Sequence, residues 1–168
     1  MKIIINKNPW FSLEKHDLPF GGEYYFINKR PTVFVVAETV KKEIIMINEY
    51  RFPINKNIWQ LPAGMMEHES PLVAAKRELF EETGFESKEW SKLGEFFVAP
   101  GHENTKIIVF LAKNLITTIN SYKTLETDVH KIKRFSKSKI EEMIRGNKIL
   151  CSISLAALNL YFISKNRI

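Results

Sequence analysis

Short apolar runs separated by turn-forming residues divide the chain into segments of two kinds. Residues 32–38 form an almost continuous β-branched run, which indicates a buried strand. Residues 18–22 have the composition of a turn, and a strand is predicted directly after it, over 23–27. Further short apolar runs predict strands over 43–51, 58–61, 96–98, 106–112 and 129–135. A second turn is predicted at 62–64.

Three segments instead carry apolar residues at helical spacing. The first begins at Ser70 and ends at Gly84, with a buried stripe of Leu72, Ala75 and Leu79. The second opens with the capping-box signature of Ser138 and Glu141 and closes at Gly146. The third is strongly apolar and covers 152–163. Strands interspersed with three helices indicate a mixed α/β domain.

The first helix carries an unusual group of carboxylates. Glu78, Glu81 and Glu82 are three and four positions apart, so they are neighbours on the helix surface. Like charges at this spacing destabilise a helix unless a bound divalent cation relieves the repulsion. Oxygen ligands suit Mg²⁺, with Mn²⁺ as a substitute, rather than zinc. The competing interpretation is an ordinary solvated acidic turn, in which Arg77 and Glu81 form a routine ion pair.

The segment Glu69–Phe85 resembles the signature of the Nudix hydrolases, G-x5-E-x7-R-E-U-x-E-E-x-G-U, where U is an aliphatic or aromatic residue. Every fixed position from Glu69 onward matches, but four residues rather than five separate Gly64 from Glu69, so the loop is one residue short. The resemblance implies the Nudix fold, a mixed central β-sheet sandwiched between helices, with a catalytic loop–helix–loop motif. Residues 31–168 would form this domain, and residues 1–30 an N-terminal, dimerising part of it.

The resemblance also implies roles for individual residues. Glu78 and Glu82 are expected to bind the metal, which agrees with their spacing, and Glu81 to add a third or water-mediated ligand. The backbone carbonyl of Ala63 would complete the set. Arg77 and Glu69 match a structural ion pair of the family, which would orient the loop and the carboxylates of the catalytic centre.

Two stretches outside this signature resemble the ADP-ribose pyrophosphatases and related nucleoside-diphosphate-sugar hydrolases. They are 49–64 and 99–107, and Pro100 lies sixteen residues after Gly84, which marks the ADP-ribose branch. Gln60 replaces a usual glutamate of this branch, and Thr105 occupies the position of another.

The general base and the substrate contacts are predicted from the same resemblance. Glu126 is the expected base, with Asp128 as the alternative, although both fit ordinary surface carboxylates in a loop. The expected substrate contacts are a guanidinium for phosphate, an aromatic ring for a base, and two loop residues: Arg51, Tyr25, Pro100 and His102. Trp10 and Phe11 are other candidates for stacking, but packing is the favoured interpretation for them.

Bulk composition narrows the picture further. The 168 residues are 45% hydrophobic and 26% charged, which fits one globular domain. The formal charge is +6, but the lysines are scattered, so a solvated face is favoured over attraction of a polyanion, and nucleic acid is not an expected partner. A single cysteine, no membrane-length apolar run and no signal-peptide pattern favour a cytoplasmic protein.

The sequence therefore predicts a Mg²⁺-dependent Nudix pyrophosphohydrolase that cleaves ADP-ribose to AMP and ribose 5-phosphate. Family likeness alone implies a homodimer. Alternative substrates are other nucleotide sugars, dinucleoside polyphosphates and 5′-capped RNA. A module that senses nucleotides without hydrolysis is the alternative from another class, but the signature has lost none of its acidic residues.

Overall fold

The computed structural model describes residues 2–117 and 129–165. Its centre is a seven-stranded sheet in the order β12-β5-β4-β10-β9, with β6 paired to β5 and β7 paired to β4. β10 runs parallel to β4, and the other pairs are antiparallel, so the sheet is mixed. The strands are β4 (Thr32–Glu38), β5 (Ile44–Arg51), β6 (Lys56–Gln60), β7 (Ala63–Met65), β9 (Glu89–Phe97), β10 (Lys106–Lys113) and β12 (Val129–Phe135).

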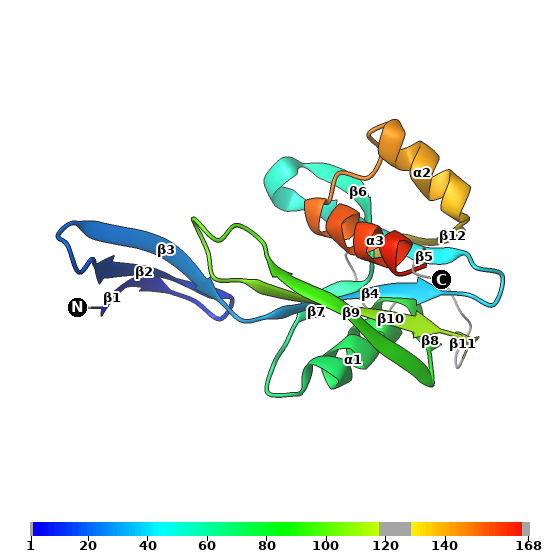
Figure 1. Cartoon of the computed structure of the whole chain (residues 1–168), viewed down its shortest axis with the longest axis horizontal. Coiled ribbons are helices and arrows are strands. Elements are labelled where there is room, and N and C mark those ends of the chain that lie inside the picture. Colours follow the sequence, from blue (N-terminus) through cyan, green and yellow to red (C-terminus); the bar gives the residue numbers. More distant parts are fainter. Residues whose placement is uncertain (1, 118–128, 166–168) are drawn as a thin grey trace.

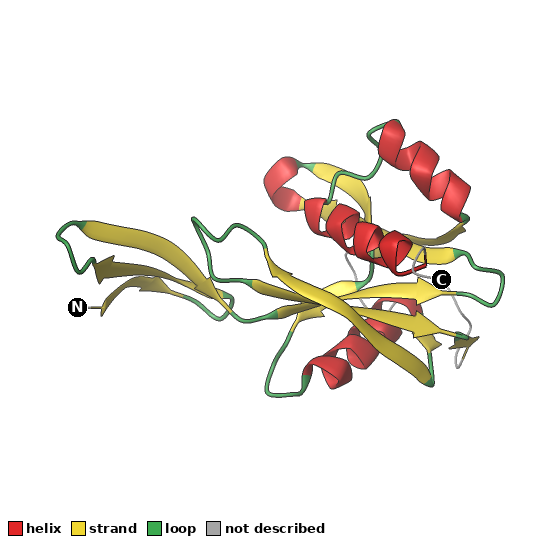
Figure 2. Cartoon of the chain, viewed as in Figure 1, coloured by secondary structure: helices red, strands yellow, loops and turns green. Residues whose placement is uncertain are grey.

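Helices cover both faces of this sheet, as the α/β prediction requires (Figure 2). Helix α1 (Pro71–Thr83) lies on one face, and α2 (Lys137–Arg145) and α3 (Ser152–Lys165) lie on the other. The alternation of β4 explains this arrangement, because Val33 and Val35 pack with α1 while Phe34 and Val36 pack with α2 and α3. None of the helices in the described part of the chain is long and apolar enough to cross a membrane.

The N-terminal residues form a separate antiparallel sheet that extends to one side of the helices (Figure 1). Its strands are β1 (Lys2–Lys7), β2 (Phe11–Asp17) and β3 (Glu23–Lys29). Sequence analysis predicted the third strand and the turn before it but not the first two, whose residues show no simple alternation. A 3₁₀ turn, η1 (Phe52–Ile54), and a small pair of strands, β8 (Phe85–Glu86) and β11 (Ile116–Thr117), complete the described elements.

Three local predictions differ from the structure, and a fourth, the N-cap of α1, is confirmed in its position only. The predicted turn at 62–64 is partly β7, which pairs with β4 through Phe34 and Ala63. The predicted strand 96–98 is the end of the much longer β9. The second predicted helix, α2, begins earlier than expected, because Ser136, not Ser138, is the N-cap and its hydroxyl accepts from the Lys139 backbone N–H at 3.2 Å. Ser70 is the N-cap of α1 by position, but its side chain makes no capping hydrogen bond.

Candidate active site

Helix α1 presents its acidic residues at two different depths. Glu78 and Glu82 are buried, with relative exposures of 5% and 2%, although carboxylates are rarely buried without a partner. Glu81 is more accessible, with its side chain 33% exposed. The helix ends at Gly84, whose φ of 70° is the left-handed conformation that glycine adopts without strain. The three glutamates therefore do not share one environment.

Strand β7 holds both buried carboxylates against the sheet. The Ala63 backbone N–H donates to Glu82 Oε2 at 2.8 Å. Gly64 leaves no room beside Glu78, because a Cβ at this position would lie 2.0 Å from Glu78 Oε1. The glycine of the short loop is thus required by its side-chain neighbour and not by its backbone angles. The loop lacks one residue relative to the family pattern, yet the glycine still contacts the helix.

Arg77 connects the loop to the helix. Its Nη2 donates to Glu69 Oε1 at 2.7 Å and to the Met65 carbonyl at 3.3 Å. Its Nη1 lies 2.8 Å from Glu78 Oε1 and 2.9 Å from Glu81 Oε2. The guanidinium is a rigid planar fork, so these contacts fix the positions of both loop and carboxylates.

These ion pairs also set the protonation of the residues concerned. The hydrogen bond from Arg77 holds the pKa of the Glu69 carboxyl below its usual value. In turn the hydrogen bond to Glu69, together with the contacts with Glu81 and Glu78, raises the pKa of Arg77 and outweighs its partial burial, which acts to lower it. Both groups are therefore charged near neutral pH, and the structural pair expected from the sequence is formed.

The donor set fits a hard divalent cation. Glu78 and Glu82 offer carboxylate oxygens, and the backbone of Ala63 lies beside them. Among residues 2–117 and 129–165, no three His, Cys, Asp or Glu side chains form a metal-binding group. Mg²⁺ commonly uses only one or two protein carboxylates and takes its other ligands from water and substrate phosphates. Glu81 points its Oε2 at Arg77, so it fits the water-mediated role better than the direct one.

A cleft of about 950 Å³ opens above these carboxylates. We call it the catalytic cleft; it lies between α1, β7 and the end of β5, and the N-terminal sheet contributes to its wall. The charged residues of the cleft are Glu78, Glu82, Arg77, Glu67, Glu49, Arg51 and Arg30, and its aromatic residues are Trp10 and Phe52. Its volume is in the range of small-molecule sites.

Arg51 lies in the catalytic cleft, where sequence analysis expected a phosphate contact. Its guanidinium Nη1 is 2.7 Å from Glu49 Oε1, and its Nε donates to Gln60 Oε1 at 3.3 Å. The Gln60 amide also donates to Glu49. Sequence analysis did not assign a role to Glu49. The alternation along β5 is the available signal, since residues two apart share one face of a strand.

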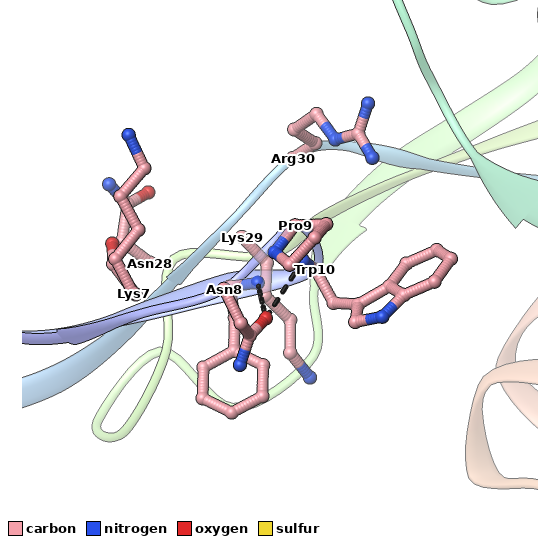
Figure 3. Close-up of a pocket in the computed structure, with 9 residues that line it drawn as sticks. Lys7, Asn8, Pro9, Trp10, Asn28, Lys29 and Arg30 are labelled. Atoms are coloured by element: carbon pink, nitrogen blue, oxygen red, sulfur yellow. Dashed lines mark hydrogen bonds between the residues drawn. The ribbon is translucent and has the colours of Figure 1, made fainter.

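Trp10 also lies at the catalytic cleft. Core or interface packing was the favoured interpretation; the side chain is 63% exposed and lines the wall of the catalytic cleft, so it is not packed in the core of this chain. The turn that carries it is well fixed, because the Asn8 side-chain oxygen accepts from the backbone N–H groups of Trp10 and Phe11 at 2.8 and 3.0 Å (Figure 3). Trp10 and Arg30 also line a neighbouring hollow of about 240 Å³.

Other predicted substrate contacts lie outside the catalytic cleft. The Tyr25 hydroxyl donates to Glu23 Oε2 at 2.7 Å on the N-terminal sheet. Pro100 lines a separate hollow of about 280 Å³. His102 is exposed, and its backbone carbonyl accepts from the Ile27 N–H at 2.9 Å. The predicted base Glu126 and its alternative Asp128 lie outside the described residues. The roles of all these residues stay predictions.

Comparison with known proteins identifies the family. The model of the NUDIX domain matches residues 28–148, well over half of the chain, and the chain therefore belongs to the Nudix family. The structure is also similar to a solved structure described as "Crystal structure of ADP compounds hydrolase", with a TM-score of 0.79 and 21% sequence identity. The match covers 100% of this chain and 95% of that chain. This structural likeness supports the fold.

Curated relatives match over shorter stretches. The ADP-ribose pyrophosphatase of Bacillus subtilis (strain 168) is 39% identical over 106 residues, which is 61% of this chain and 57% of that protein. The ADP-ribose pyrophosphatase of Mycobacterium tuberculosis (strain ATCC 25618 / H37Rv) is 35% identical over 49% of this chain and 41% of its own length. The GDP-mannose pyrophosphatase of Escherichia coli (strain K12) is 32% identical over 47% and 44%. The chain spans about half the length of the curated relatives it matches.

Proposed function

We propose that this protein is a Mg²⁺-dependent pyrophosphohydrolase that cleaves ADP-ribose to AMP and ribose 5-phosphate. The observation that carries the proposal is the pair of buried carboxylates, Glu78 and Glu82, at the floor of a cleft of about 950 Å³. Burying two acids side by side on a helix is costly, and a bound cation would offset this cost in addition to the contacts that Arg77 and the Ala63 N–H already make. Nudix hydrolases generally need divalent metal ions, and the donor set described above suits Mg²⁺ or Mn²⁺.

Different residues of the chain have different roles in this proposal. Glu78 and Glu82 hold the metal, which when bound neutralises charge on the phosphates and lowers the pKa of water. Arg77 keeps both loop and helix in place through Glu69 and Met65. Arg51 contributes positive charge for a phosphate group at the opposite wall of the cleft. Glu126 is the proposed base, with Asp128 as the alternative.

The exposed ring of Trp10 supports a nucleotide as the substrate. An aromatic side chain fixed at the wall of a cleft offers a face on which a base stacks, and such stacking contributes about 1–3 kcal/mol per base in single-stranded nucleic-acid complexes. Two of the curated relatives described above are ADP-ribose pyrophosphatases. A homodimer is proposed from family likeness, with the N-terminal sheet as the dimerising part.

Replacing Glu82 by glutamine tests the proposal. The variant keeps the size of the side chain but removes the charge that holds the metal, so hydrolysis of ADP-ribose with Mg²⁺ should fall at least 10²-fold, a loss of about 2.7 kcal/mol of transition-state stabilisation. Glu142→Gln is the matched control, because Glu142 is a surface residue of α2 paired with Lys139. Equal AMP release by Glu82→Gln and wild type would refute the metal assignment. If the wild type releases no product from any diphosphate compound, the alternative of a module that senses nucleotides without hydrolysis would be favoured.

A further inference from the structure

A side lobe of about 450 Å³ opens from the catalytic cleft. Five residues line both spaces: Trp10, Arg51, Ala63, Gly64 and Met65. The lobe continues between β3, β10 and the loop 99–105, and its floor is apolar, with Phe34, Val98 and Ile107. A group attached to a diphosphate at Glu78 and Glu82 therefore has this lobe beside it. The further inference rests on the proposed function and concerns the chemistry of that group.

Glu103 is the acidic residue of this lobe, and its backbone is firmly placed. Its N–H donates to the Ala99 carbonyl at 2.9 Å. On either side of it, the Ile27 N–H donates to the His102 carbonyl at 2.9 Å, and the Asn104 N–H donates to the Ile27 carbonyl at 3.2 Å. The loop is thus hydrogen-bonded to β3 like an added strand. A side chain on such a fixed backbone is positioned before any ligand binds.

The carboxylate of Glu103 is held as well. Its side chain is only 16% exposed, the buried Thr105 hydroxyl donates to it, and Lys29 Nζ lies 3.6 Å away. The side chains of Lys29 and Arg30 point in different directions (Figure 3). Both line the hollow of about 240 Å³, but only one of them lines each of the two larger spaces. Of the two, Lys29 lines the lobe together with Glu103, and Arg30 lines the catalytic cleft.

The lobe has two cationic residues among the described ones, Lys29 and Arg51, and one acidic residue, Glu103. In the proposed function Arg51 serves a phosphate of the diphosphate, which leaves Lys29, already paired with Glu103. An additional phosphate placed here would therefore meet the negative charge of Glu103 without a further free cation to offset it. A carboxylate accepts hydrogen bonds, so the favoured occupant donates them and carries no charge.

We propose that Glu103 is a specificity-determining residue that selects a neutral, hydroxyl-bearing group, such as a sugar, on the diphosphate. It accepts hydrogen bonds from the hydroxyls of that group and disfavours substrates with phosphates beyond the second. Thr105 and Lys29 hold its carboxylate in place at the lobe. The lobe therefore separates nucleotide sugars from dinucleoside polyphosphates, which composition and signature leave as alternatives.

The experiment compares kcat/KM for ADP-ribose and for diadenosine tetraphosphate in wild type and in Glu103→Gln. The variant loses the charge-assisted hydrogen bonds, so ADP-ribose hydrolysis should fall about tenfold. It also releases Lys29 from its partner, so the preference for ADP-ribose over the tetraphosphate should fall by about tenfold or more. Lys29→Met removes a cation of the lobe while the Thr105 hydroxyl still holds Glu103, so it should raise this preference. Glu95→Gln is the matched control, since Glu95 lies on β9 and pairs with Lys92 and Lys106.

The outcomes separate the inference from the proposed function. A preference within twofold of wild type in Glu103→Gln, with ADP-ribose still hydrolysed by wild type, overturns the role of Glu103 and leaves the proposed function standing. Absence of hydrolysis by wild type overturns both. If Glu103→Gln does not fold, as judged by circular dichroism, Lys29→Met alone decides, and an unchanged or reduced preference in that variant refutes the proposal.

Discussion

Replacing Gly64 by alanine is a sharp test of how the loop and the helix are fitted together. The methyl group would lie 2.0 Å from Glu78 Oε1, whereas ordinary contacts begin at 3.4 Å. The carboxylate must therefore move by about 1.4 Å. Gly64 does not have a positive φ, so alanine fits its backbone and the strain falls on the carboxylate alone.

Stability and activity should respond differently to this change. Moving Glu78 costs its contact with Arg77 Nη1, about 0.5–1.5 kcal/mol, and the restricted unfolded state of alanine offsets about 0.4–1 kcal/mol of it. The net change corresponds to a fall in Tm of no more than about 4 °C for a domain of this size. A displacement of about 1 Å at a catalytic centre costs about 10²-fold in rate, so kcat/KM for ADP-ribose should fall by at least that factor.

The assay measures AMP release from ADP-ribose across Mg²⁺ concentrations, together with the thermal unfolding of each variant. Gly101→Ala is the matched control, because an added Cβ there meets nothing within 4 Å. We expect the control to keep both activity and Tm. Retention of wild-type kcat/KM by a folded Gly64→Ala protein would show that the contact between Gly64 and Glu78 does not set the catalytic geometry.

Two further predictions concern ion pairs. Arg77→Lys keeps the charge but loses the planar fork that reaches Glu69, Glu78 and Glu81. We therefore expect the unfolding free energy to fall by about 1–3 kcal/mol and kcat/KM to fall at least tenfold. Urea unfolding and AMP release measure the two effects, and unchanged values would contradict the prediction. Burial of Glu38 acts to raise the pKa of its carboxyl group. The hydrogen bonds from Tyr161, Lys165 and Lys42 together outweigh this effect and lower the pKa from 4.5 to about 2. A lowered folded-state pKa contributes stability above about pH 4.5 that is lost as the pH falls toward 2. The stability difference between wild type and Glu38→Gln should therefore shrink from pH 5 to pH 3 in urea unfolding, and a constant difference would refute the assignment.

Local sequence patterns predicted the central elements of the fold well. The β-branched run at 32–38 is β4 with the same bounds, and 129–135 is β12. The apolar stripe on α1 is also confirmed, since Ala75 and Leu79 are fully buried. These elements were predictable because each carries its own periodicity. The first two strands of the N-terminal sheet were not, since β1 pairs with β2 and β2 with β3, and this pairing rather than an apolar core holds them.

The candidate site was only partly predictable from the chain. The signature predicted which acidic residues lie on the helix and which arginine lies beside them, because helical spacing alone decides which residues can be neighbours. It also separated Glu78 and Glu82, as expected direct ligands, from Glu81, but it did not predict that the first two are buried while Glu81 is partly exposed beside Arg77. That difference arises from β7, where Gly64 contacts Glu78 and the Ala63 N–H meets Glu82.

The sequence by itself therefore determined the class of fold, the Nudix signature and the oxygen-rich chemistry of its helix. The tertiary structure alone decided which residues face the cleft from distant parts of the chain. Glu49 and Gln60 meet Arg51 across two strands, Trp10 arrives from the N-terminal sheet, and Glu103 reaches its lobe because its loop pairs with β3. Such contacts depend on strand order and register, which are properties of the assembled sheet and leave little trace in local sequence.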